Sequence, residues 1–294
     1  MYQRNQDKEL LRRALGPLEK FHDWYWRERD VTDSGLIAVG VYGDNVQGAR
    51  NETYDNECCL DDLQLTRHPK RPEVTRGPWV GEGRWYGDIC VSGNTGYLLQ
   101  AERSLVRLAK ALGETAMAER RQKRIDKSVT AVRRHMWDPE SGTFLAVRRD
   151  SLEKIRIPTI GSWMPLIAEV PTPAMAARMA EAIQTDHWQT PLPIPTVDRH
   201  DKRWVAASYW RGDVWPVPNY QVATGLAQYG YTAIAADICD KTIANALKHG
   251  VNEHYDSVTG KPLGVGNLGM SCAIVTMMLD GLSKKYRLRA KAAV

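Results

Sequence analysis

The stretch WDPESG at residues 137–142 and its echo YDSVTG at residues 255–260 indicate how this chain folds. Each places an aromatic residue and an aspartate ahead of Ser or Thr and Gly. The aspartate can accept hydrogen bonds from backbone N–H groups two residues on, and the glycine permits a positive φ. Each stretch therefore predicts a tight turn that closes a helix. Because one supersecondary unit is repeated, we expect a toroid of helical hairpins.

Hydrophobic periodicity predicts helices on both sides of these turns. Near the N-terminus, steps of three and four residues separate Leu11, Leu15, Leu18, Phe21 and Tyr25. Further helical patterns cover 94–112, 115–136, 173–184, 216–229, 233–249 and 268–286. Only one short strand is expected, within 143–147, and about fifty residues from 36 to 88 form a long loop of the kind that is usually functional. No linker interrupts the pattern, so we predict one all-α domain over residues 1–294.

Composition excludes several classes of protein. The 294 residues are 43% hydrophobic and 26% charged, which is typical of a globular chain rather than a disordered one. No apolar run approaches the roughly 18 residues of a membrane span, and no apolar stretch follows the N-terminus as in a signal peptide. The net charge of +5 is spread along the chain, which argues against nucleic-acid binding. Five cysteines without a CxxC pair predict a reduced, cytoplasmic chain with no metal and no cofactor.

The aromatic residues are biased toward those with a polar tip. The chain has 10 Trp and 12 Tyr but only 2 Phe. Trp and Tyr combine a flat apolar face with a hydrogen-bonding group, which suits a wet, concave site. Because a sugar ring has a flat C–H face bordered by hydroxyls, this bias points to a carbohydrate ligand.

Three segments place carboxylates beside aromatic, Arg or Asn residues in loops at helix ends. They are 50–57 (RNETYDNE), 209–220 (YWRGDVWPVPNY) and 252–256 (NEHYD). Hydrolysis of a glycosidic bond commonly uses two carboxyl groups on opposite sides of that bond. One is protonated and assists the leaving oxygen, while the other is ionised and attacks or activates water.

These segments resemble the motifs of glycoside hydrolase family 63 and its trehalase-like relatives. YWRGDVWPVPNY resembles the family signature YWRGPVWPPxNY, and NEHYDSVTGKPLG at 252–264 resembles ExYDPxTGxxxG. RNETYDNE resembles, more loosely, ESGxDNSP. The likeness runs along essentially the whole chain. It implies an (α/α)6 barrel that cleaves an α-glucosidic or α-mannosidic bond with inversion.

The resemblance also assigns roles to individual residues. It makes Glu253 the general base and Asp55 the general acid. It places the remaining site residues around the sugar, and these are Glu52, Trp210, Arg211, Asp213, Trp215 and Tyr255.

The chain departs from the family pattern in three places. Glu52 and Asp55 are three positions apart, whereas the family motif has four. Asp213 replaces a proline, and its carboxylate could bind sugar hydroxyls, pair with Arg211 or compete for the role of the acid. Only about twenty residues precede the segment that matches the family from Asp23 onward, so the resemblance implies a barrel without its first hairpins.

Three alternatives stay open. The missing hairpins would leave an apolar face exposed around residues 11–25, which predicts a homodimer or a partner subunit. The chain could be a non-catalytic carbohydrate-binding relic or a fragment that works only with such a partner. A sugar epimerase on the same barrel type would need two histidines facing the pocket, and no motif supplies that pair.

Overall fold

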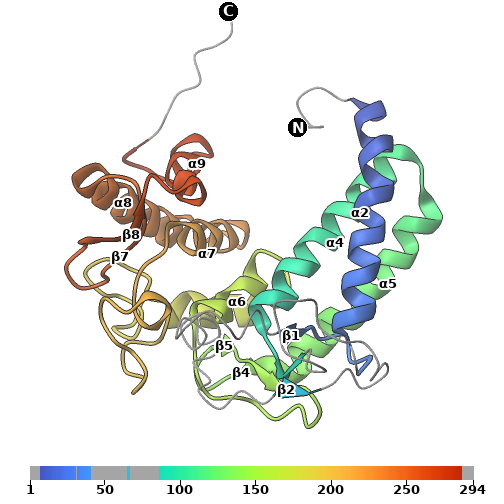
Figure 1. The fold of residues 1–294 in the computed structure, drawn as a ribbon, viewed down its shortest axis with the longest axis horizontal. Coiled ribbons are helices and arrows are strands. Elements are labelled where there is room, and N and C mark those ends of the chain that lie inside the picture. The colour runs from blue at the N-terminus through green and yellow to red at the C-terminus, as the bar shows by residue number, and fades with distance from the viewer. Residues whose placement is uncertain (1–6, 31, 41–64, 67–85, 287–294) are drawn as a thin grey trace, which may run out of the picture.

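The computed structural model describes residues 7–30, 32–40, 65–66 and 86–286, and in this part of the chain helices follow one another along an open arc (Figure 1). The arc begins with α2 (Lys8–Arg29), α4 (Ser92–Leu112) and α5 (Thr115–Ala131) and ends with α7 (Pro216–Gln228), α8 (Thr232–His249) and α9 (Ala273–Leu279). The short helix α6 (Pro173–Ala182) lies between these groups. The predicted all-α architecture of successive helical hairpins is confirmed.

The first group is held by apolar contacts and by one buried cluster of charges. Leu11 and Leu15 of α2 are buried, and α4 packs against both α2 and α5. Glu102 on α4 is fully buried. Both of its carboxylate oxygens accept hydrogen bonds from Nη1 of Arg121, at 2.9 and 3.0 Å. Burial raises the pKa of Glu102, but the nearby His22, 3.4 Å from Oε1, and the charge of Arg121 outweigh burial, so this pKa lies below its usual range. Nε1 of Trp26 on α2 also donates a hydrogen bond to Oε1 at 2.8 Å. Glu102 is therefore ionised and ties the three helices together.

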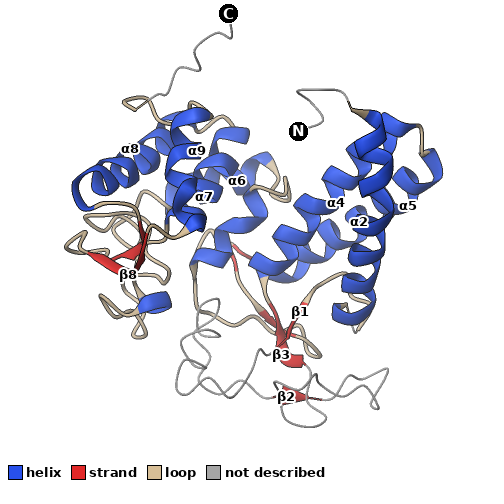
Figure 2. Cartoon of the chain, turned by 45° about the horizontal axis from the view of Figure 1, so that its top comes forward, coloured by secondary structure: helices blue, strands red, loops and turns tan. Residues whose placement is uncertain are grey.

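A small antiparallel sheet lies beside these helices, where the sequence predicted only a loop (Figure 2). Strand β3 (Tyr86–Cys90) pairs with β1 (Ala38–Gly40), β2 (Leu65–Thr66) and β6 (Val147–Arg148). Residues 143–147 do not form the one expected strand. They are divided between β5 (Thr143–Phe144), which pairs with β4 (Trp137–Asp138), and the first residue of β6.

The second group of helices packs through the 3-10 segment η2 (Ile160–Leu166), which contacts both α4 and α7. Close packing here requires a glycine, because a Cβ on Gly225 of α7 would lie 2.5 Å from Cβ of Leu166. Helix α7 also contacts α8 and α9. The last helix is shorter than predicted: a 3-10 turn, η4 (Gly269–Cys272), precedes α9, which ends at Leu279.

The two echoed turns are similar, although the aspartate accepts from the third residue on in one turn and from the second residue on in the other. Asp138 accepts a hydrogen bond from the backbone N–H of Ser141 at 3.0 Å, and Asp256 accepts one from Val258 at 2.9 Å. Gly142 and Gly260 end the turns with φ of 67° and 70°. Each turn joins two short strands that follow a helix, β4 to β5 and β7 (Asn252–Tyr255) to β8 (Pro262–Gly266), rather than closing the helix itself.

The first helix leaves part of its apolar surface exposed, as predicted. Leu18, Phe21 and Trp24 of α2 are 40%, 55% and 38% exposed, whereas Leu11 and Leu15 pack inward. Among the described residues, none of the helices has the length and hydropathy to span a membrane.

Candidate active site

Two of the predicted segments meet through their backbones. Val214 and Tyr255 exchange a pair of hydrogen bonds, from Val214 N–H to Tyr255 O at 2.8 Å and from Tyr255 N–H to Val214 O at 3.0 Å. This bridge joins the 209–220 segment to strand β7 although about forty residues separate them. The chain therefore brings Glu253 and the tryptophans into one region.

Aromatic rings form a stack at this junction. The rings of Trp210 and Trp215 are 4.2 Å apart and nearly parallel, with an interplanar angle of 8°. The His254 ring lies 4.7 Å from Trp215 at 15°, so that it continues the stack. Tyr209 meets Trp215 and His254 edge-on. Trp215 is buried and Trp210 is half-buried, which leaves part of the Trp210 ring open to a ligand.

The stack is anchored by a buried acid. Nδ1 of His254 lies 2.8 Å from Oδ2 of Asp213, and Asp213 is fully buried. Burial raises the pKa of Asp213 above its usual range, although the hydrogen bond from His254 opposes the shift. Asp213 therefore holds the His254 ring in place. Full burial of its carboxyl argues against direct contact with sugar hydroxyls, while the competing role of Asp213 as the acid stays a prediction.

Glu253 projects from β7 over strand β8. Its Oε2 atom accepts a hydrogen bond from the backbone N–H of Val265 at 2.9 Å, and its side chain is half-buried. A Cβ on Gly264 would lie 2.3 Å from Oε2 of Glu253 and 2.8 Å from Nε2 of His254. These two side-chain atoms are thus no farther apart than the sum of those distances. Because Gly264 has no side chain, the Glu253 carboxylate and the His254 ring both fit next to it.

The loop before the stack is constrained at each step. Ala207 and Tyr209 have positive φ values of 54° and 51°, a conformation that non-glycine residues adopt at an energetic cost and that is found most often at functional sites. Gly212 must lack a side chain, because a Cβ there would lie 2.4 Å from the carbonyl oxygen of Val205. The Arg211 carbonyl accepts a hydrogen bond from Val205 N–H at 2.9 Å, so the half-buried Arg211 is held next to the stack by its backbone.

Some predicted site residues have other positions. Tyr255 is fully buried in the hydrophobic core, where its hydroxyl donates to Gly250 O at 2.6 Å and accepts from Asn252 N–H at 3.0 Å. The expectation that Tyr255 binds substrate is corrected for this reason: the side chain has no surface that a sugar could reach. Asp55 and Glu52 lie outside the described residues.

Sequence reasoning missed His254. The residue follows Glu253 directly and the family-like pattern does not specify it, so the only available signal was the unusual acid Asp213 in the neighbouring motif. A buried carboxylate requires a partner. That partner could have been sought among the residues of the third segment.

The helical hairpins and the motif junction define an (α/α)6-type glycosidase fold, and comparison with known proteins identifies the family. Residues 1–271 match the mannosylglycerate hydrolase MGH1-like glycoside hydrolase domain. The chain belongs to this family, which confirms the resemblance to glycoside hydrolase family 63.

Curated relatives agree with this assignment. A mannosylglycerate hydrolase of Rubrobacter radiotolerans is 29% identical over 189 residues, which is 63% of this chain and 42% of the relative. One of Thermus thermophilus is 30% identical over 139 residues, 47% of this chain and 34% of the relative. The chain thus spans less than half the length of these relatives.

Among solved structures, a family 63 mannosylglycerate hydrolase of Thermus thermophilus in complex with glucose has a similar fold. Its TM-score is 0.74 at 23% identity, and the match covers 93% of this chain and 72% of that one. The neutral trehalase of Saccharomyces cerevisiae aligns with a TM-score of 0.51 at 17% identity, over 62% of this chain and 36% of the trehalase. The helical arc is therefore that of the (α/α)6 glycosidases.

Proposed function

We propose that this protein hydrolyses an α-glycosidic bond with inversion, using Glu253 as the general base and Asp55 as the general acid. The observation that supports the proposal is the junction of two family motifs, at which Glu253 directly precedes His254, whose ring continues the Trp210–Trp215 stack. A carboxylate next to aromatic faces is the arrangement that a sugar ring and an attacking water require. Membership of a glycoside hydrolase family supports the same chemistry.

The proposed chemical steps are those of an inverting glycosidase. Glu253, held by Val265 N–H, takes a proton from a water that attacks the anomeric carbon. Asp55 gives a proton to the leaving oxygen at the opposite side of the bond. The water between the two carboxyl groups requires a separation of about 6.5–9.5 Å. The exposed part of Trp210 stacks on the sugar ring, while Trp215, His254 and Asp213 hold Trp210 and the strand of Glu253 in place.

The substrate class follows from the names of the relatives. Several are mannosylglycerate hydrolases, so we infer an α-linked hexose whose leaving group is a small hydroxy acid, with simple α-glucosides as the alternative. Arg211 is the positively charged residue of the 209–220 segment. Its guanidinium can form charge-assisted hydrogen bonds with the carboxylate of such a leaving group. Hydrolysis of mannosylglycerate and of a neutral α-mannoside, compared at equal concentration, tests this preference.

The assignment of the acid can be tested with two leaving groups. A glycosyl fluoride needs no protonation of its leaving group, whereas an alkyl glycoside does. Asp55→Asn should therefore lose activity on the alkyl glycoside, by about 10²–10⁴-fold, and keep most of its activity on the fluoride. Equal losses on both substrates would reject Asp55 as the acid. Asp61→Asn, six positions further along the sequence, is the control and should change neither rate.

A second candidate is a carbohydrate-binding chain that acts only with a partner. The exposed Leu18, Phe21 and Trp24 on α2 favour it, and a second copy of the chain is the partner we infer. Light scattering should then give a dimer that Phe21→Ser converts to a monomer. A monomer at high concentration that hydrolyses glycosides would reject this candidate. The cytoplasmic location expected from the cysteines stays a prediction.

The epimerase alternative has less support. Its chemistry needs two histidine bases, and among the described histidines only His254 lies at the motif junction, with one ring nitrogen committed to Asp213.

A further inference from the structure

Three potential metal ligands converge on the surface away from the motifs. They are Asp186, His187 and His200, and one donor atom from each lies within 4.8 Å of the others. Asp186 and His187 belong to the turn that follows α6, and His200 belongs to the loop that leads to η3 (Tyr209–Arg211). A backbone hydrogen bond from Arg199 N–H to His187 O, at 3.0 Å, ties the turn to the loop. The convergence therefore rests on two separate segments and not on neighbours in sequence alone.

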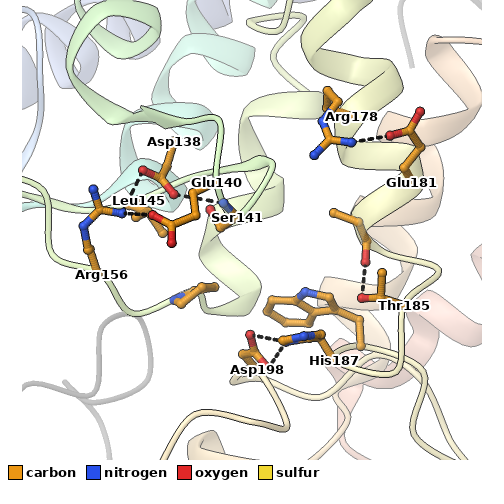
Figure 3. Close-up of a pocket in the computed structure, with 13 residues that line it drawn as sticks. Asp138, Glu140, Ser141, Leu145, Arg156, Arg178, Glu181, Thr185, His187 and Asp198 are labelled. Atoms are coloured by element: carbon orange, nitrogen blue, oxygen red, sulfur yellow. Dashed lines mark hydrogen bonds and ion pairs between the residues drawn. The ribbon is translucent and has the colours of Figure 1, made fainter.

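A fourth residue orients one of the rings. Both oxygens of Asp198 lie within 2.9 Å of Nδ1 of His187 (Figure 3), and Oδ1 also accepts the backbone N–H of His200 at 2.8 Å. When the carboxylate holds the proton on Nδ1, the lone pair of His187 is on Nε2. A histidine whose second nitrogen donates to a carboxylate is the usual arrangement around protein-bound zinc, because the carboxylate fixes the tautomer and makes the ring more basic.

We propose that Asp186, His187 and His200 bind a divalent transition-metal ion of the zinc class. Asp198 accepts the hydrogen bond from Nδ1 of His187 and so orients its ring. Two imidazoles and one carboxylate are the ligand set of such ions, whereas Ca²⁺ and Mg²⁺ prefer oxygen ligands alone. All three ligands are exposed, so the fourth coordination position is open to water.

One of the three distances between ligand atoms is already close to that in an occupied site. Bonds of about 2.0–2.2 Å in a tetrahedral site place neighbouring ligand atoms about 3.3 Å apart. Nε2 of His200 and Oδ2 of Asp186 are 2.9 Å apart, and thus need to separate by only a few tenths of an ångström. The His187 and His200 ring centroids are 4.5 Å apart, and all three donor atoms lie within 4.8 Å of one another, so the donor atom of His187 has to move closer when an ion binds.

The ion would fix one wall of a cavity. His187 and Asp198 line a cavity of about 440 Å³ whose other wall carries Asp138 and Arg156 (Figure 3). The same loop continues to the candidate active site, since Thr196 N–H donates to the carbonyl oxygen of Asp213 at 3.1 Å. The expected consequence of binding is a more stable loop over residues 186–200, and the hydrolytic steps require no metal.

Metal titration of the untagged, chelator-treated full chain tests the proposal. Isothermal titration calorimetry should show that one equivalent of Zn²⁺ binds to the wild-type chain. This binding should be lost in the double variant His187→Gln/His200→Gln and in the single variant Asp186→Asn. Asp198→Asn keeps an acceptor oxygen but loses the charge, so it should weaken this binding by about 10–100-fold. The matched control is His135→Gln, which alters a histidine outside the cluster and should leave the equivalent unchanged. Circular dichroism without metal shows whether each variant is folded.

A second readout needs no variant. Bound Zn²⁺ should protect His187 and His200 of the wild-type chain from modification by diethyl pyrocarbonate, as read by peptide mass spectrometry, and should leave His135 as reactive as before. The proposal is overturned if the double variant binds Zn²⁺ as the wild type does, or if Zn²⁺ gives no protection of either histidine. In either case the cluster is a pair of surface His–Asp hydrogen bonds.

Discussion

Nδ1 of His254 lies 2.8 Å from Oδ2 of the fully buried Asp213, directly behind the aromatic stack of the candidate active site. The two residues come from different motifs, and their hydrogen bond runs beside the backbone bridge between Val214 and Tyr255. Asp213 occupies a position where the family pattern has proline. The pair therefore gives this chain its own way of fixing the strand that carries Glu253.

Removal of His254 should cost more than removal of the charge on Asp213. His254→Ala leaves a buried carboxyl without its partner and should lower the free energy of unfolding by about 3 kcal/mol. Asp213→Asn keeps a hydrogen-bond acceptor and should cost about 1 kcal/mol. Urea unfolding of both variants and of the double variant gives the coupling energy. Strictly additive losses would show that the two side chains do not interact.

The buried Glu102 should make stability sensitive to acid. The folded pKa of Glu102 is lower than its unfolded value, so the unfolded chain takes up a proton first as the pH falls below about 4.3. Stability from this group is thus fully present above that pH and is lost as pH falls toward the folded pKa. Urea unfolding between pH 6 and pH 3 should show this loss in the wild type.

Glu102→Gln is the variant that isolates this effect. It removes the fully buried counter-charge of Arg121, which keeps the more exposed Asp23 and Glu19, and should lower the free energy of unfolding at neutral pH by about 3 kcal/mol. Its stability should also fall less steeply with acid than that of the wild type. The exposed Glu153→Gln is the control, with an expected change within about 0.5 kcal/mol. An acid dependence that is identical in Glu102→Gln and wild type would contradict the prediction.

Gly264 should matter for turnover beyond its effect on stability. Its φ is +68°, so alanine there is strained by about 1–2 kcal/mol, and its Cβ would also displace Glu253. Gly230 has φ +89° with no atom within 4 Å of a built Cβ, so Gly230→Ala carries the strain without the clash. We expect similar unfolding energies for the two variants but a kcat at least tenfold lower in Gly264→Ala alone. Equal kcat values for Gly264→Ala and Gly230→Ala would show that Glu253 does not lie near the reacting bond.

Trp210 should act mainly in binding. Trp210→Ala removes the half-buried ring of the stack and should raise KM about tenfold, as expected for roughly 1.4 kcal/mol of lost sugar contact. Trp137→Ala is the matched control, because that half-buried tryptophan packs on Phe144 instead. It should lower stability and leave KM unchanged. A KM for Trp210→Ala that matches the wild type would argue against sugar stacking.

The helices and the joined motifs were accessible from the sequence because both depend on local patterns. Apolar periodicity predicted α4 and α8 to within two residues at each end, and the family-like motifs predicted that Glu253 and Trp215 come together. Helix α9 was overestimated, since the apolar period continues past the point where Gly281 takes φ 69° and the helix stops at Leu279.

Features that depend on distant partners were missed. The strands of the small sheet are two to five residues long and are stabilised by pairing across the chain, as between Ile89 and Arg148, so they leave no periodic signal. Tyr255 was placed in the sugar pocket because its neighbours match a motif. Its side chain turns inward because the bridge to Val214 fixes the strand, and only the tertiary structure decides that direction.

The central claim is that Glu253 activates the attacking water, and the most direct measurement compares mannosylglycerate hydrolysis by the wild type and by Glu253→Gln. The glutamine keeps the shape and can still accept from Val265 N–H, so the unfolding energy should change little. We predict a fall in kcat of about 10²–10⁴-fold, with proton NMR of the wild-type product showing the β-anomer first. Turnover that is unchanged in Glu253→Gln, or an α-anomer formed first, would contradict it.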